Sequence, residues 1–119
     1  MSALNVSTIN GVDVQNLAKQ TARAWVNFNG SGVIAINSAY NVASITDNGV
    51  GDYTVNFSAA MPTATYAVVG TAQDKAASGT PASFQRRFGS ALTTLAARFT
   101  YRDPSGSFDT TEVCVVVFG

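Results

Sequence analysis

Hydrophobic and polar residues alternate with a period of two over most of the chain, beginning near Ala24. The clearest run is residues 53–58, Tyr-Thr-Val-Asn-Phe-Ser, in which apolar and polar residues alternate without an error. This period places neighbouring side chains on opposite faces of an extended chain and is typical of a half-buried β-strand. The pattern predicts further strands at residues 25–29, 33–37, 40–45, 66–72, 83–89, 94–101 and 112–118.

Segments rich in glycine, asparagine and proline separate these runs. Residues 30–32, 47–52 and 103–106 have the composition of turns, and residues 73–82 form the longest predicted connection. Seven or eight short strands separated by turns predict an all-β fold, an antiparallel β-sandwich or jelly roll.

Two strands are more uniformly apolar than the others. Residues 66–72 carry few polar side chains, which predicts a central strand. Residues 112–118 are apolar on both faces, which predicts that both faces are buried.

The N-terminal segment has a different pattern. Residues 1–12 are weakly patterned and predict an extended arm, and residues 13–23 have apolar positions at helical spacing behind Asp13, which can cap a helix. Such a short helix is marginal in water unless it packs on the domain or on other copies. We therefore divide the chain into an attachment or oligomerisation arm with a short helix, residues 1–23, and a sandwich head, residues 24–119. The candidate interface residues of the arm are Val6, Ile9, Val14, Leu17 and Ala18.

The chain has few charges. Charged residues make up 12% of it, below the roughly 25% of an average domain, and seven Lys and Arg balance seven Asp and Glu. A weakly charged surface with zero net charge favours self-association, and the lack of basic excess excludes nucleic acid as an expected partner. The sole basic pair, Arg86-Arg87, points to opposite faces of a strand, and we expect one of the two to form a salt bridge.

Membrane insertion and secretion are not expected. No apolar run approaches the roughly 18 residues that a membrane span needs, and the first residues lack the pattern of a signal peptide. We therefore expect synthesis in a cytoplasm.

The residues that usually perform catalysis are scarce. The chain has no histidine, one cysteine and a single glutamate, Glu112, so the sequence predicts no enzyme activity, no cofactor and no metal. Cys114 lies in a valine-rich strand, where a buried core cysteine is expected. Asp47 and Asp52 could offer oxygen ligands to calcium, but their spacing is more typical of residues that cap a hairpin.

Aromatic side chains and loops offer one candidate for ligand binding. Exposed aromatic rings stack well on sugars, whereas aromatic residues at strand spacing are more often part of the core. The aromatic candidates are Trp25, Phe28, Tyr40 and Tyr53. The candidate receptor-facing loop residues are Lys75, Ser78, Thr80, Asp103 and Ser105.

Several segments resemble a family of small tailed-phage proteins. They are residues 23–30 (Arg-Ala-Trp-Val-Asn-Phe-Asn-Gly), residues 40–42 (Tyr-Asn-Val) and residues 44–57, which contain Asp-Asn-Gly-Val-Gly-Asp-Tyr-Thr-Val-Asn-Phe. The opening residues 1–9 and the terminal residues 117–119 are similar to the family as well.

Members of this family, frequent in marine phages, are described as tail fibre or virion structural proteins. The resemblance implies a virion component assembled in the host cytoplasm, and it carries no functional residue over to this chain. Because phage appendages are commonly trimers, we expect a homotrimeric fibre or appendage component that contacts other virion proteins. Two alternatives stay open: a capsid decoration or cement protein, and a module that binds host surface polysaccharide.

Overall fold

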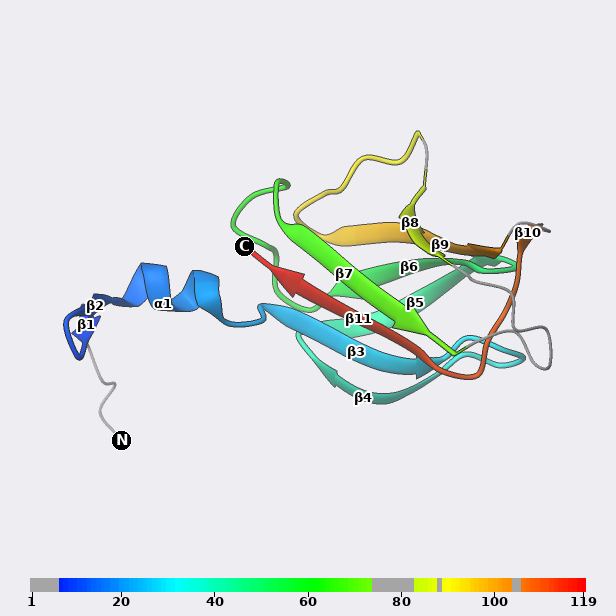
Figure 1. Ribbon diagram of the computed structural model, residues 1–119, viewed down its shortest axis with the longest axis horizontal. Coiled ribbons are helices and arrows are strands. Elements are labelled where there is room, and N and C mark those ends of the chain that lie inside the picture. Colours follow the sequence, from blue (N-terminus) through cyan, green and yellow to red (C-terminus); the bar gives the residue numbers. More distant parts are fainter. Residues whose placement is uncertain (1–6, 74–82, 88, 104–105) are drawn as a thin grey trace.

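The computed structural model describes residues 7–73, 83–87, 89–103 and 106–119. These residues form a short N-terminal hairpin, a helix and two antiparallel sheets that pack face to face (Figure 1). The predicted all-β antiparallel sandwich is confirmed.

The two sheets have simple strand orders. The four-stranded sheet has the order β4 (Ala35–Tyr40), β3 (Ala24–Asn29), β11 (Val113–Phe118) and β7 (Ala67–Ala72). The five-stranded sheet has the order β10 (Gly106–Ser107), β9 (Ala96–Asp103), β6 (Asp52–Phe57) and β5 (Val42–Gly49), with β8 (Ser83–Arg86) paired to β9.

The N-terminal segment projects from one end of the sandwich (Figure 1). It consists of a hairpin, β1 (Thr8–Ile9) and β2 (Val12–Asp13), followed by helix α1 (Val14–Gln20). The helix is shorter than the predicted span of residues 13–23. The backbone N–H of Arg23 donates to the carbonyl of Val117 at 2.8 Å, so the chain is already drawn toward the sheet at that point.

The core lies between the inward faces of the two sheets. The clear alternation of residues 53–58 is confirmed, because Tyr53, Val55 and Phe57 are buried and the residues between them are partly exposed. The Tyr53 ring stands edge-on to the ring of Phe28 in the opposite sheet, with centroids 5.3 Å apart. Aromatic contacts of this kind join the two sheets.

Two expectations about apolar strands are wrong. β7 is an edge strand and not a central one, because within the described residues it pairs with β11 alone. β11 is central, but only Val113, Val115 and Val117 are buried, whereas Cys114 and Val116 are half-buried and Phe118 is 37% exposed. The second face of β11 is the outer face of the sandwich, which nothing in the described part of the chain covers.

The hydroxyl of Tyr53 ties together the loops at the far end of the sandwich. It lies 2.7 Å from the carbonyl oxygen of Gly30 and 2.9 Å from Oδ1 of Asp109, and it donates its proton to one of them. The same Asp109 oxygen accepts a hydrogen bond from the N–H of Gly51 at 2.8 Å, and the N–H of Gly30 donates to the carbonyl of Thr110 at 2.9 Å. The β3–β4 turn, the β5–β6 turn and the segment between β10 and β11 are therefore held together through the side chains of Tyr53 and Asp109.

Glycine is required at two of these contacts. A Cβ atom at Gly30 would lie 2.5 Å from the Tyr53 hydroxyl oxygen. Gly51 has a φ of +62°, and a Cβ atom there would lie 2.6 Å from the carbonyl oxygen of Phe108. The first glycine permits a close approach and the second a left-handed backbone.

We expect Tyr53→Phe to lower the free energy of unfolding by about 1–2 kcal/mol, because it removes the buried hydroxyl that hydrogen-bonds the Gly30 carbonyl or the Asp109 carboxylate. Tyr40→Phe is the matched control, since the Tyr40 side chain is exposed. Urea denaturation at neutral pH measures both variants. An equal effect of the two substitutions would show that the Tyr53 hydroxyl does not hold the loops.

Candidate functional site

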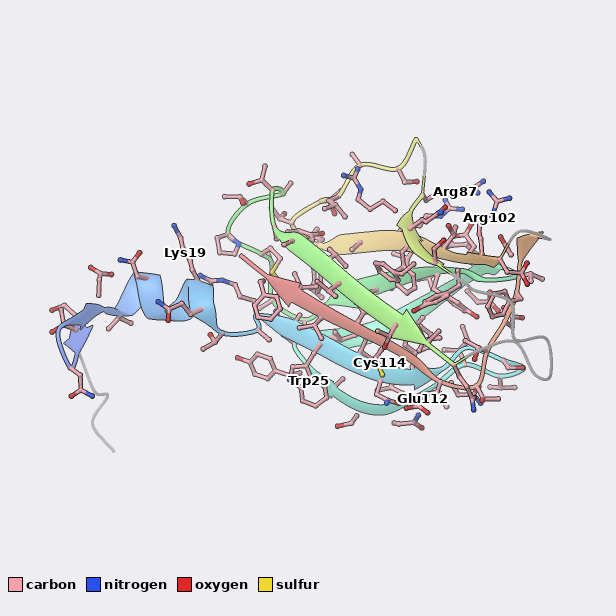
Figure 2. The ribbon with its side chains drawn as sticks, viewed as in Figure 1. Lys19, Trp25, Arg87, Arg102, Glu112 and Cys114 are labelled. Carbon is pink, nitrogen blue, oxygen red and sulfur yellow. The ribbon has the colours of Figure 1, made fainter. Side chains whose placement is uncertain are left out.

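Charge is distributed very unequally between the two sheets. The strands of the four-stranded sheet read AINSAY, AWVNFN, VCVVVF and AVVGTA and contain no Asp, Glu, Lys or Arg. The strands of the five-stranded sheet carry Asp47, Asp52, Arg86, Arg98, Arg102 and Asp103. Figure 2 shows Arg102 on the side of β9 and Trp25 on the side of β3. The strands of the four-stranded sheet therefore give its outer face no charge, and we call it the uncharged face; Glu112, which precedes β11, contacts Asn27 at its edge.

Four apolar side chains form a row across this uncharged face. The strand registers pair Tyr40 with Trp25, Trp25 with Val116, and Val116 with Val69. Tyr40 is 57% exposed, Trp25 38% and Val69 56%, and Val116 is half-buried. Three strand spacings make this apolar row about 14 Å long. Phe118, 37% exposed, lies two residues further along β11 on the same face and extends the row.

The adjacent row on the same face is polar but uncharged, and it contains Ser38, Asn27, Cys114 and Thr71. The amide nitrogen of Asn27 donates to Sγ of Cys114 at 3.3 Å and to Oε1 of Glu112 at 3.4 Å. Cys114 is half-buried at the surface, so the prediction of a core cysteine is wrong. The alternation along β11 directs its neighbours Val113 and Val115 into the core and Cys114 outward.

The chain enters the sandwich at Arg23, which forms hydrogen bonds through its side chain and through its backbone carbonyl. Its Nε donates to the carbonyl of Gly119, and its own carbonyl accepts a hydrogen bond from Nδ2 of Asn41 at 3.2 Å. Asn41 has a φ of 55°, a left-handed conformation that asparagine tolerates, and it also donates to the carbonyl of Ala59 at 3.2 Å. These bonds join the N-terminal segment, the corner between β4 and β5, and the end of β11.

Two grooves flank the entry segment, residues 21–23, which we call the neck. One has a volume of about 440 Å³ and is lined in part by Arg23 and Tyr40. The other has a volume of about 590 Å³ and is lined in part by Arg23, Ala67 and Phe118. Because Tyr40 and Phe118 also belong to the uncharged face, the apolar surface continues to the neck.

The charged outer face holds an ion-pair cluster around Asp52. Its carboxylate accepts two hydrogen bonds from Arg98, at 2.9 Å from Nε and 2.8 Å from Nη2, and Nε of Arg87 lies 3.9 Å away. The bond from Arg98 lowers the pKa of Asp52 below its ordinary value, with the Coulomb attraction of both arginines adding to it, and the same bond raises the pKa of Arg98. The salt bridge expected for one member of the pair Arg86-Arg87 is confirmed at Arg87.

The two aspartates that flank the β5–β6 turn have different roles. Oδ1 of Asp47 accepts a hydrogen bond from the N–H of Gly49 at 3.0 Å, which confirms the expected cap. The carboxylate of Asp52 is directed mainly to Arg98 across the strands, and the side chain of Asn48 in the turn also hydrogen-bonds it. Among the described residues, no three His, Cys, Asp or Glu side chains lie close enough to hold a metal ion.

Three buried tyrosines are held in the neutral form. Burial raises the pKa of Tyr101 to about 12 and that of Tyr66 above its ordinary value. Burial, together with the hydrogen bond to Asp109, raises the pKa of Tyr53 further. The hydroxyls of Tyr53 and Tyr66 donate hydrogen bonds to other groups of the fold.

The structure separates the four aromatic candidates into two pairs. Phe28 and Tyr53 are fully buried and cannot stack on a ligand. Trp25 and Tyr40 are exposed and adjacent across β3 and β4. Only the second pair can contact a partner.

The arm and loop candidates are only partly described. Val14 begins α1 and is half-buried. Asp103 is the last residue of β9. The candidates that lie outside the described residues are Val6, Lys75, Ser78, Thr80 and Ser105, together with the side chains of Ile9, Leu17 and Ala18.

Comparisons of this chain with protein-family models, with curated proteins and with solved structures gave no match. In the described part of the chain, no helix has the length and apolar character needed to span a membrane.

We expect Asp52→Asn to destabilise the protein at pH 7 and to have little effect at low pH. The pKa of Asp52 is lower in the folded chain than its ordinary value of 3.8. The stability that it contributes is therefore present above that value and is lost as the pH falls through the folded pKa. Urea denaturation from pH 7 to pH 2 measures this convergence.

Asp47→Asn is the control, because an asparagine oxygen can still accept the hydrogen bond from Gly49. The same pH dependence in both variants would contradict a specific role of the Asp52 ion pair.

Proposed function

We propose that this chain is a non-enzymatic structural protein of a phage particle, a homotrimeric fibre or appendage component attached through its N-terminal segment. The observation that carries the proposal is the uncharged apolar sheet face that adjoins the projecting helix. The longest dimension of the molecule is 52 Å, and the helix and the loop end lie at opposite ends of it (Figure 1). An attachment element at one end and loops at the other suit an appendage.

The N-terminal segment supports the same proposal. Helix α1 has seven residues, about 10 Å of helix, which is too short to be stable alone. Its main contact is with β2 and not with the strands of the sandwich. A helix that gains little from its own head is stabilised when other copies or other virion proteins cover it.

The family resemblance of residues 1 to about 70 supports placement in the virion. Two residues of the resembling segments have structural roles here: Asn41 forms the corner at the neck, and Tyr53 ties the loops. These roles explain why such segments would recur in a scaffold that carries no catalytic group.

We expect the full-length protein to have a solution mass of about 37 kDa, three chains of 12.4 kDa each. Size-exclusion chromatography with light scattering over a wide concentration range measures it, and mass spectrometry of purified particles tests whether the chain is a virion component. A 12.4 kDa species at every concentration would contradict the homotrimer and favour a decoration protein that finds its partner only on the capsid.

Glycan recognition is the second candidate, and the exposed pair Trp25 and Tyr40 favours it. Two neighbouring aromatic rings form a platform for the apolar face of a sugar ring. If this is the function, host polysaccharide fragments will change the fluorescence of Trp25, the single tryptophan, and Tyr40→Ala will weaken binding. Tyr66→Phe is a control, since the Tyr66 ring is buried. Unchanged fluorescence at millimolar glycan would exclude this candidate.

A further inference from the structure

We infer that the apolar row, together with Phe118, is the surface through which the heads of neighbouring copies of this chain contact one another. The inference rests on the proposed function, because it assumes self-association. It goes further by assigning that contact to the outer face of the four-stranded sheet and not to the N-terminal segment alone.

Charge favours a second copy as the occupant of this face. A charged partner surface would lose its hydration against the apolar row without gaining an opposite charge, since the strands of this sheet supply none. A copy of the same face brings apolar and neutral polar groups from its four strands, with Glu112 at its edge. With a net charge of zero, the whole chains do not repel one another either.

The area of the face shows what else the contact needs. Strands of six residues are about 20 Å long and four of them are about 19 Å wide, which gives a projected area of roughly 400 Å². A stable interface buries about 800 Å² on each partner. The face alone is therefore small for a permanent interface, and additional surface must come from the neighbouring elements.

The neck and helix lie where that additional surface is needed. The groove that Arg23, Ala67 and Phe118 line joins the end of the apolar row to the neck. The apolar row itself lies toward the neck, because Trp25 is the second residue of β3 and Tyr40 the last residue of β4. One partner surface can therefore cover the helix, the neck and the apolar row together.

The edge strands of the sheet support a covered location. Soluble sheets usually protect their edges with lysine, proline or bulges. β7 is an edge strand, and its residues Ala67–Ala72 contain no charge and no proline. Its pairing with β11 shows no register shift. Such an edge does not pair with the strands of other molecules when a neighbouring subunit covers it.

Val69→Lys on the full-length protein tests the inference. Val69 is 56% exposed, so the monomer tolerates lysine there, but an assembled face would bury an unpaired charge. We expect the protein concentration at half-assembly to rise by about tenfold or more, measured by light scattering. Val50→Lys is the matched control, because Val50 is 60% exposed and lies in the turn between β5 and β6. Circular dichroism checks that both variants fold.

Two side chains on the same face can report assembly. Trp25 is the single tryptophan and Cys114 the single cysteine of the chain. On assembly we expect the emission of Trp25 to shift to shorter wavelength and the alkylation of Cys114 by a bulky maleimide to slow. In Val69→Lys, at the same concentration, both signals should return to those of the monomer.

The outcomes separate the inference from the proposed function. An oligomer with exposed Trp25 emission, rapid Cys114 alkylation and no response to Val69→Lys overturns the inference and leaves the homotrimer intact. A full-length chain that is monomeric at every concentration overturns both. Equal losses of assembly in Val69→Lys and Val50→Lys also overturn the inference, because the effect would then not belong to this face.

Discussion

The side chain of Tyr53 holds the two sheets and the loop end of the molecule in one arrangement. Its ring is fully buried between Phe28 of the four-stranded sheet and Phe99 of its own sheet, so the position of its hydroxyl is fixed. The hydroxyl reaches Gly30 and Asp109, which belong to two different connections. Because β3 ends at this contact, the same tyrosine also fixes how β3 presents its outward residues to solvent.

The shared core allows the two outer faces to differ. Both sheets direct aromatic and β-branched side chains into the core. The packing of these side chains does not require any charged residue on the outer faces. Outside, the five-stranded sheet carries the ion pair of Asp52 and Arg98, whereas the four-stranded sheet presents Trp25 and Val69. The two outer faces of one sandwich therefore differ in polarity: one carries an ion pair, and the strands of the other present apolar and neutral polar side chains.

The sequence predicts the β-sandwich and several of its details. Alternation assigns Tyr53, Val55 and Phe57 to the core because the period of a strand is a local property. Alternation does not say which strands are neighbours, so it cannot predict that β11 is central and that β7 is an edge strand. The apolar row needs four strands drawn from distant parts of the chain, and only their registers bring it together. Likewise, the backbone of Arg23, which the sequence places in the helix, is hydrogen-bonded to Val117 of the sheet, a contact between distant parts of the chain.

The bond between Arg23 and Gly119 places the two ends of the sandwich chain beside each other at the neck. A polypeptide fused after Gly119 would therefore emerge next to the helix and crowd the N-terminal segment. The β3–β4 turn lies at the opposite end, where Gly32 has a φ of 65° and Val33 is almost fully exposed. A foreign peptide inserted at that turn would be displayed away from the N-terminal helix, which makes the turn the natural position for an epitope or an affinity tag.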